Sequence, residues 1–421
     1  MSKLKIIGGK PLKGEVKVAG HKNSALKLMA AVLLSKETST LTNVPAIRDV
    51  EVLSDIIRAL GAEVQDNGEG SLTINPAALN SWEPDLELMG RIRAGIVVAA
   101  PLLVKFGKVN LPRPGGDSIG ERLIDTHASM MEAFGATVEK GHEMLKVDGS
   151  NLHAAEVFLE EASPTATEMA LMIAAGLPGE SVIEGAACEP HVVDLEELLI
   201  EMGATIEGVG THILRVKGAE NLKGVTHKVR PDYLEVGTFA IAAAITGGEV
   251  VIHDAWKQDL KIILLYLGKM GVKYEFLDDK TLRVSPSSLK ATQRAFKTRP
   301  WPGFPSDLMS PFIVLATQTE GTVLCHDWMY ESRMFFVDIL RAMGANIVLA
   351  DPHRAIVTGK TKLHGDIIQS PDIRAGGAGV LASLAADGES IVEHAEIIDR
   401  GYESFEQKLS ALGANIERIE D

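Results

Sequence analysis

The segment Leu60-Gly61-Ala62-Glu63-Val64 contains the pattern that decides the fold: an apolar residue, a glycine, a small residue, any residue and a second apolar one. The pattern recurs along the whole chain, with its glycines at positions 61, 135, 203, 271, 344 and 413, which are 68 to 74 residues apart. Such regular spacing is typical of internal repeats. We therefore predict six copies of one structural unit.

Each copy of the pattern is predicted to end a helix and begin a strand. Apolar residues with helical periodicity precede the first glycine, at Leu53, Ile56, Ile57 and Leu60. The glycine itself favours the left-handed conformation that terminates many helices. Upstream lies a short strand such as 248–252, and before it a helix that is apolar almost all round, such as 239–245, which must be buried. The predicted unit is a buried helix, a strand, a surface helix and further strands.

The sixth copy is incomplete at the end of the chain. Most copies continue with a second signature, as in Val216-Lys217-Gly218 followed by Leu222-Lys223-Gly224-Val225, but the sixth reaches Asp421 without it. The missing signature stands at the beginning, within residues 7–16, so residues 1–21 are predicted to supply the last strands of repeat six. We expect an α/β protein of two three-repeat domains, with helices inside and sheets outside. One would be continuous (22–230, with the Asp117 loop), the other discontinuous (1–21 plus 231–421), and the active site would lie in the cleft between them.

The composition restricts the functional class. The chain has 421 residues and a formal charge of −15, which argues against nucleic acid or an acidic membrane as the main partner. We find no secretory signal and no apolar run near the roughly 18 residues of a membrane helix, so a cytoplasmic location is expected. Cys188 and Cys325 are interpreted as reduced thiols. The twelve histidines lack metal-ligand spacing, and neither a metal nor a cofactor is predicted.

Unexpected charges stand where the buried helices begin. Lys22-Asn23, Arg93, Asp307 and Arg374 open the first, second, fifth and sixth of these helices, and Arg122, Arg333 and Arg400 lie near the starts of surface helices. A cation does not favour a helix N-terminus, but an external anion can bind to both. A solvated surface charge is the alternative for any one of them. Their recurrence favours a site for phosphate and carboxylate groups.

Two carboxylates stand beside these cations. Asp307 ends the segment 302–307 and could simply cap a helix. Asp117 lies in the loop Pro114-Gly115-Gly116-Asp117-Ser118-Ile119-Gly120, where an ordinary turn aspartate is the alternative. This loop lacks the Gly-Lys-Ser/Thr ending of a Walker A motif.

The chain resembles the enolpyruvyl transferases over essentially its whole length, and among them the branch that acts on UDP-N-acetylglucosamine. The motifs that carry the resemblance are Gly20-His21-Lys22-Asn23-Ser24, Arg93-Ala94, the loop 114–120 with Arg122, the segment 302–307, Glu331-Ser332-Arg333, Asp372-Ile373-Arg374-Ala375 and Asp399-Arg400-Gly401-Tyr402-Glu403. The resemblance implies an inside-out α/β barrel fold. It also implies transfer of the enolpyruvyl group of phosphoenolpyruvate to a sugar 3-hydroxyl with release of phosphate, the first committed step of peptidoglycan synthesis.

The resemblance implies a role for each candidate residue, with no cofactor and no obligate protein partner. Lys22, Arg122 and Arg400 would bind the phosphate of phosphoenolpyruvate, and Arg333 and Arg374 would lie near its carboxylate or in the network that closes the domains. Asn23 would bind the acceptor, Arg93 its diphosphate side, and Asp307 would accept the proton of the attacking hydroxyl. Ser163 and Asp372 are further expected substrate-binding residues, and Asp117 is expected to act as a general acid or in product release.

Three positions depart from the family's usual pattern. Asp117 replaces a cysteine, so we predict insensitivity to the epoxide antibiotic fosfomycin, which forms a thioether with that cysteine. Tyr233 replaces an arginine, and Ser163-Pro164-Thr165 replaces a commoner Ser-Val-Gly. The last two leave the acceptor open, and a nucleotide ribose hydroxyl is the alternative acceptor. The alternative to an enzyme is a non-catalytic binding paralogue on the same scaffold.

Overall fold

The computed structural model describes residues 2–112, 124–141 and 144–420, so Asp117 and Arg122 lie outside the described residues. The chain divides into two compact units. The N-terminal unit begins at Gly20 and ends at Arg230, and the C-terminal unit comprises the residues up to Ala19 together with those from Pro231 onward. Each unit has its own hydrophobic core.

The six repeat glycines terminate helices, as predicted. Their φ angles lie between 88° and 116°, a region that residues with a Cβ rarely adopt. Each glycine is followed within a few residues by a strand: β4 (Glu63–Gly68), β7 (Thr137–Lys140), β11 (Thr205–Glu207), β15 (Lys273–Asp278), β19 (Ile347–Asp351) and β23 (Asn415–Glu420). The repeat pattern thus marks the same helix-to-strand turn in each of the six repeats.

The N-terminal unit contains three repeats of helices and strands. Its helices are α1 (Lys22–Ala31), η1 (Val32–Leu34), α2 (Arg48–Ala59), α3 (Leu86–Arg91), η2 (Arg93–Val98), α4 (Ala99–Phe106), α5 (Asp125–Ala133), α6 (Pro164–Gly176) and α7 (Pro190–Met202), where η denotes a 3-10 helix. Its other strands are β3 (Ser39–Thr42), β5 (Ser71–Asn75), β6 (Lys108–Pro112), β8 (Met144–Asp148), β9 (Glu156–Phe158), β10 (Glu180–Glu184), β12 (Ile213–Lys217) and β13 (Thr226–Lys228). The second buried helix starts at Arg93, as expected, but as 3-10 helix η2 before α4.

The C-terminal unit repeats the same order. Its helices are α8 (Tyr233–Thr246), η3 (Lys257–Asp259), α9 (Lys261–Lys269), η4 (Ser306–Leu308), α10 (Met309–Thr317), η5 (Arg333–Phe336), α11 (Val337–Ala342), α12 (Ile373–Ala385), α13 (Ala395–Ile398) and α14 (Phe405–Ala411). Its other strands are β1 (Ser2–Ile7), β2 (Lys13–Lys17), β14 (Glu249–His253), β16 (Thr281–Ser285), β17 (Ala295–Lys297), β18 (Gly321–His326), β20 (Arg354–Gly359), β21 (Ile367–Gln369) and β22 (Glu389–Glu393). Arg333 is the first residue of η5, at the start of the fifth surface helix.

The beginning of the chain completes repeat six. Strand β1 pairs antiparallel with both β22 and β23, and β2 pairs parallel with β14 of repeat four. In the N-terminal unit, β13 of repeat three likewise pairs parallel with β3 of repeat one. The prediction from the missing signature is therefore confirmed. In both units the last strand of the third repeat joins the sheet of the first, so the three repeats close into a ring.

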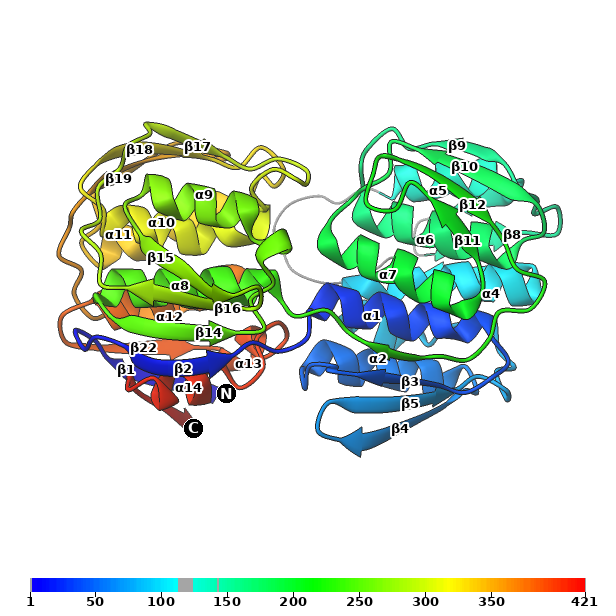
Figure 1. Ribbon diagram of the computed structural model, residues 1–421, viewed down its shortest axis with the longest axis horizontal. Coiled ribbons are helices and arrows are strands. Elements are labelled where there is room, and N and C mark those ends of the chain that lie inside the picture. Colours follow the sequence, from blue (N-terminus) through cyan, green and yellow to red (C-terminus); the bar gives the residue numbers. More distant parts are fainter. Residues whose placement is uncertain (1, 113–123, 142–143, 421) are drawn as a thin grey trace. The chain divides into compact units, whose positions relative to one another are not determined.

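The helices without a polar face are buried, as their sequences predict. Every residue from Tyr233 to Ala244 of α8 is buried, and α8, α10 and α12 contact one another. The sheets of this unit lie outside them (Figure 1). The described strands form six open sheets, so what the resemblance calls a barrel is, in each unit, a ring of open sheets around helices rather than one closed sheet.

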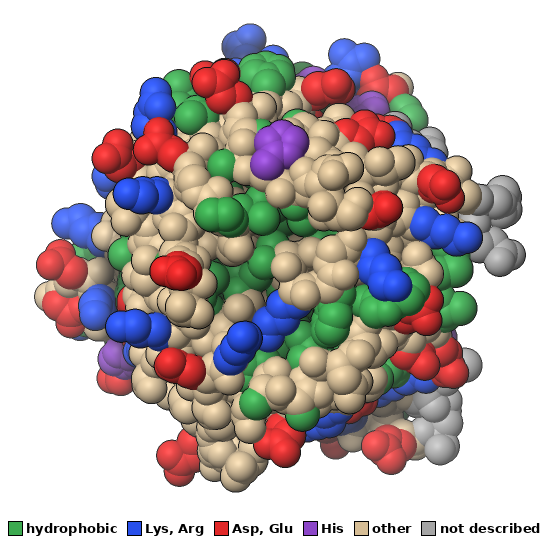
Figure 2. All heavy atoms as spheres, turned by 90° about the vertical axis from the view of Figure 1, so that its right-hand side faces the viewer, with side chains coloured by type: hydrophobic (Ala, Val, Ile, Leu, Met, Phe, Trp, Pro, Cys, Tyr) green, Lys and Arg blue, Asp and Glu red, His purple; other side chains and the backbone are tan. Residues whose placement is uncertain are grey.

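On the face shown in Figure 2, acidic and basic side chains are interspersed, with hydrophobic side chains between them near the middle. Within the described ranges no helix is long and apolar enough to cross a membrane. The same residues contain no group of three or more histidine, cysteine, aspartate or glutamate side chains that could hold a metal ion.

Candidate active site

In the C-terminal unit, Asp307 is paired with two arginines. Arg333 Nη2 lies 3.1 Å from Asp307 Oδ1, and Arg374 Nη2 lies 3.6 Å from Asp307 Oδ2. The side chains of Arg333 and Arg374 are nearly buried, at 3% and 7% exposed, whereas that of Asp307 is 31% exposed. Arg333 Nη1 also donates to the carbonyl of Ser306 at 3.1 Å. The result is a partly exposed carboxylate held between two cations that solvent barely reaches.

Neighbouring acidic groups keep both arginines charged. Burial alone would lower the pKa of Arg333, but the charges of Asp307, Asp372 and Asp327 outweigh it and raise the pKa. Burial opposes the charge of Arg374 in the same way, and Tyr402 and Asp307 raise its pKa above the ordinary value. Two fixed cations at a partly exposed position can bind an anionic ligand.

The capping of the core helices distinguishes Asp307 from its acidic neighbours. Asp372 caps α12 by accepting from the backbone N–H groups of Arg374 and Ala375 at 2.8 and 2.9 Å. Asp232 caps α8 in the same way. Asp307 is not a capping residue, because the N-caps of η4 and α10 are Pro305 and Leu308. The helix-capping alternative for Asp307 is thus excluded, whereas Asp372 has the structural task of capping α12.

Arg400 follows the short helix α13, in a segment anchored on both sides. Asp399 receives two hydrogen bonds from Arg418, at 2.7 and 2.9 Å. The buried ring of Tyr402 lies under the guanidinium of Arg374, 5.1 Å from the ring centroid, and its hydroxyl lies 3.2 Å from that of Thr238. This segment therefore supports Arg374 directly.

In the N-terminal unit, Lys22 is the first residue of α1 and pairs with Asp49 in the first turn of α2, with Nζ and Oδ2 2.6 Å apart. Both side chains are largely buried. Asn23 follows Lys22 and is half-buried. Helix α1 also contacts η2, the 3-10 helix that begins with Arg93. Three of the predicted residues thus come from the starts of two neighbouring helices.

Ser163 precedes α6, a helix that contacts both α5, which carries His127, and η2, which begins with Arg93. Ser163 caps α6 and accepts from the N–H of Ala166 at 3.5 Å, while Pro164 occupies the first turn and has no N–H to offer. His127 Nε2 lies 2.8 Å from the hydroxyl of Thr165. Burial, together with the charge of Arg93, lowers the pKa of His127 to about 4, so its imidazole is neutral at pH 7.

The structure thus brings Asp307, Arg333 and Arg374 together in one unit, and places Lys22, Asn23, Arg93 and Ser163 at helix starts in the other. Sequence reasoning missed Asp49, Asp327, Tyr402 and His127. Asp49 had a visible signal, since Arg48-Asp49 opens an amphipathic helix just as Lys22 opens a buried one. Tyr402 stood in the quoted motif 399–403 without a role, and Asp327 and His127 had no signal, because each is recognised only by the cation or hydroxyl beside it.

Comparison with known proteins identifies the class. The sequence profile of the EPSP synthase (3-phosphoshikimate 1-carboxyvinyltransferase) family matches residues 6–409. The enolpyruvyl transferase NikO from Streptomyces tendae superimposes with a TM-score of 0.90 over 99% of each chain at 24% identity. EPSP synthase from Acinetobacter baumannii superimposes with a TM-score of 0.76 over 100% of each chain at 19% identity. The chain belongs to the enolpyruvyl transferase family that this profile describes.

Relatives of higher identity come from one branch of that family. The UDP-N-acetylglucosamine 1-carboxyvinyltransferase of Bradyrhizobium diazoefficiens is 44% identical, over 98% of this chain and 97% of its own. The protein of the same name from Treponema denticola is 42% identical, over 98% of each chain. Similarity of this extent spans both units.

Proposed function

We propose that this protein transfers the enolpyruvyl group of phosphoenolpyruvate to the 3-hydroxyl of UDP-N-acetylglucosamine and releases phosphate. This is the first committed step of peptidoglycan synthesis, through which the enzyme would support cell shape and division. The observation that carries the proposal is the partly exposed Asp307 between the buried guanidinium groups of Arg333 and Arg374. Its relatives of 40–44% identity, which are UDP-N-acetylglucosamine 1-carboxyvinyltransferases, support the choice of acceptor.

The reaction proceeds by addition and elimination. In the addition, the acceptor oxygen bonds to C2 of phosphoenolpyruvate, a proton adds to its methylene carbon, and Asp307 takes the proton of the hydroxyl. In the elimination, the C–O bond to phosphate breaks and the methylene carbon gives up a proton to restore the double bond. Each positioned acid or base contributes roughly 10²–10⁴-fold to such a reaction. Asp117 is our candidate for the acid.

The cations divide the anionic groups among them. We assign the phosphate of phosphoenolpyruvate to Lys22, Arg122 and Arg400, and its carboxylate to Arg333 and Arg374. Asn23 binds the acceptor hydroxyl region, and Arg93, Ser163 and Asp372 complete the substrate contacts. Residues of both units take part in this assignment.

Asp307 becomes a better base when phosphoenolpyruvate binds, because it then shares Arg333 and Arg374 with the carboxylate of that substrate. Without substrate, Arg333 and Arg374 stabilise the ionised carboxylate of Asp307. A carboxylate that loses part of such stabilisation holds a proton more strongly. Once the carboxylate of phosphoenolpyruvate competes for the same guanidinium groups, Asp307 accepts the hydroxyl proton more readily.

Release of phosphate tests the proposal. Purified protein with phosphoenolpyruvate should release phosphate when UDP-N-acetylglucosamine is added, and not when uridine or adenosine nucleotides without the sugar are added. Release only with a nucleotide ribose would favour the alternative acceptor. No release with any acceptor, combined with tight binding of UDP-N-acetylglucosamine, would favour a binding protein.

Two departures from the family pattern bear on the acceptor. Tyr233 is buried and packs edge-on against Trp301, with ring centroids 5.5 Å apart. Pro164 removes one N–H from the first turn of α6, where the acceptor's diphosphate would otherwise find a donor. We therefore expect weaker binding of the diphosphate than the commoner Ser-Val-Gly turn would provide, because valine keeps the N–H that Pro164 lacks, without a change in the reaction.

A further inference from the structure

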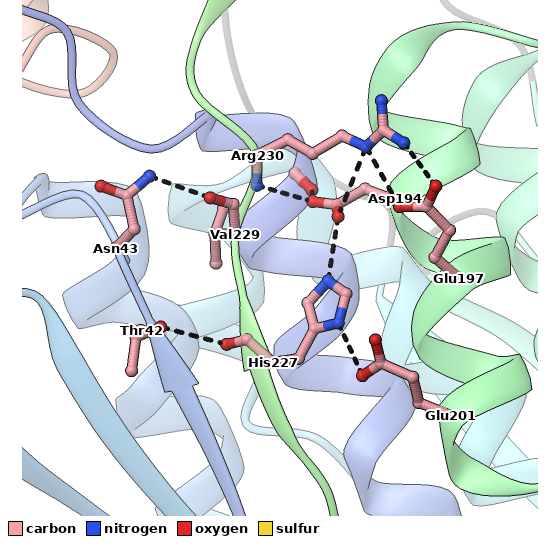
Figure 3. A network of polar contacts seen from close by, with 9 residues as sticks. Thr42, Asn43, Asp194, Glu197, Glu201, His227, Val229 and Arg230 are labelled. Carbon is pink, nitrogen blue, oxygen red and sulfur yellow. Dashed lines mark hydrogen bonds and ion pairs between the residues drawn. The ribbon is translucent and has the colours of Figure 1, made fainter. Parts of the chain in front are cut away.

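Asp194 forms a buried network outside the candidate active site. It lies in the middle of α7 and is 1% exposed. Its Oδ2 accepts from the hydroxyl of Ser24 and, at 3.0 Å, from the backbone N–H of Arg230, while its Oδ1 lies 2.9 Å from His227 Nε2 (Figure 3). A buried carboxylate needs several donors, and this one has three, from helix α1 and from the stretch 227–230.

Two cations surround this carboxylate. Arg230 Nε lies 3.8 Å from Asp194 Oδ1, and its Nη2 lies 2.5 Å from Glu197 Oε1. His227 Nδ1 donates to Glu201 Oε2 at 2.9 Å (Figure 3). Burial opposes the charge of His227, but Asp194 and Glu201 together raise its pKa to about 9. At pH 7 the histidine is therefore charged and donates from both ring nitrogens.

The network ends at the first turn of α1. Ser24 is the third residue of that helix, directly after Lys22 and Asn23, and its side chain is fully buried. His21, the N-cap, stacks on His191 of α7 with ring centroids 5.0 Å apart, and its N–H donates to the carbonyl of Arg230 at 2.7 Å. The start of α1 is thus attached to α7 and to the segment that follows β13.

We propose that Asp194 is a positioning residue for enolpyruvyl transfer, acting through Ser24 to hold Lys22 and Asn23 in register with the substrates. The inference rests on the proposed function of Lys22 and Asn23. A serine hydroxyl within a helix commonly bonds to its own helix, as Ser54 of α2 does to the carbonyl of Val50 at 2.8 Å. Ser24 instead bonds to another helix, which fixes the rotation of α1 about its axis. A misplacement of 1 Å at a reacting group can cost on the order of 10²-fold in rate.

The first test compares two serine substitutions. Ser24→Ala removes the link between α1 and Asp194, and Ser54→Ala is its matched control, because both serines are buried in the same unit and differ in whether the bond leaves the helix. We expect kcat/KM for phosphoenolpyruvate to fall about tenfold in Ser24→Ala and to stay within about twofold of wild type in Ser54→Ala. Equal kinetics in the two variants would overturn the inference.

A double-mutant cycle tests whether Ser24 acts through Asp194. If it does, Ser24→Ala combined with Asp194→Ala should be no slower than Asp194→Ala alone, because Asp194→Ala already removes the oxygen that accepts from Ser24. Multiplicative losses in the double variant would show independent effects and reject the inference. Circular dichroism and urea unfolding of each variant show that the measured protein is folded; should Asp194→Ala not fold, the comparison of Ser24→Ala with Ser54→Ala still decides.

Failure of this inference differs from failure of the proposed function. Wild-type protein without phosphate release from phosphoenolpyruvate and UDP-N-acetylglucosamine would contradict the function itself. Active wild-type protein with an equally active Ser24→Ala variant would contradict only the positioning role.

Discussion

Asp307 and Asp194 are both aspartates with two cations beside them, but they differ in exposure and in saturation. Asp307, in the C-terminal unit, is 31% exposed and meets Arg333 and Arg374. Asp194, in the N-terminal unit, is 1% exposed, and Ser24, His227 and the backbone of Arg230 donate to it. A carboxylate with solvent-facing lone pairs can accept a proton from a substrate, whereas a saturated one can only hold its neighbours in place. We therefore propose that exposure and the number of donors, rather than residue type, distinguish the proton-accepting role of Asp307 from the positioning role of Asp194.

The largest expected effect is on turnover in Asp307→Asn. The amide keeps the shape of the side chain but cannot accept the hydroxyl proton, so kcat should fall by roughly 10²–10⁴-fold. Binding of UDP-N-acetylglucosamine, measured by calorimetry, should persist. Turnover near the wild-type rate would remove Asp307 from the role of base.

The next effect is on stability in Asp194→Asn. Removing the charge from a buried carboxylate leaves His227 and Arg230 without their shared counter-ion, and such changes cost about 3–5 kcal/mol. The matched control is Glu201→Gln, because Glu201 contacts the same His227 but its side chain is 48% exposed. That control should cost under about 1 kcal/mol. Urea unfolding measures both, and equal losses would contradict the distinction by burial.

The charge of His227 gives a smaller, pH-dependent contribution. Its pKa is raised to about 9 in the folded protein, against about 6.5 for an unperturbed histidine. The folded state therefore binds the extra proton between these values, so the stabilisation is complete below about pH 6.5 and is lost as the pH rises through about 9. We expect a loss of roughly 2 kcal/mol after solvent screening.

Urea unfolding of wild type and His227→Gln from pH 6 to 10 measures this contribution. The two curves of unfolding free energy should converge at high pH. Curves that stay parallel over the whole range would show that His227 does not change its charge there.

The smallest expected effect on turnover is that of Asp117→Cys. We propose that the carboxylate of Asp117 confers insensitivity to fosfomycin, since it cannot form the thioether that inactivates cysteine-bearing relatives. The cysteine variant should keep turnover within about tenfold of wild type and gain covalent labelling, which intact-protein mass spectrometry detects. Labelling of the native protein at residues 114–120 would refute the proposed insensitivity.

Much of the fold could be predicted from short sequence patterns. The six glycines mark helix ends because only their positive φ angles terminate a helix cheaply, and a local requirement leaves a local signal. The absent second signature after Gly413 correctly placed β1 beside β22 and β23. Charges at the starts of apolar helices indicated Lys22, Arg93, Asp307 and Arg374, because an unexplained charge beside a buried segment needs a partner.

Some details of the elements escaped the sequence. The second buried helix begins as the 3-10 helix η2, and the sixth surface helix is divided into α13 and α14. Neither break is visible in the apolar periodicity. Where a helix is 3-10 rather than α, or is interrupted, depends on which backbone hydrogen bonds its packed neighbours allow.

The sequence by itself determined the repeated unit, the closure of repeat six and the residue types that gather at the helix starts. Only the tertiary structure decided that Arg333 and Arg374 share Asp307, that Asp232 and Asp372 are helix caps, and that Ser24 bonds to Asp194. A helix end or an apolar face is encoded by residues a few positions apart. The partner of a charged or polar side chain can lie far along the chain, as Arg374 does from Asp307 and Asp194 from Ser24, and it is settled only when the helices pack together and exclude water from the groups between them.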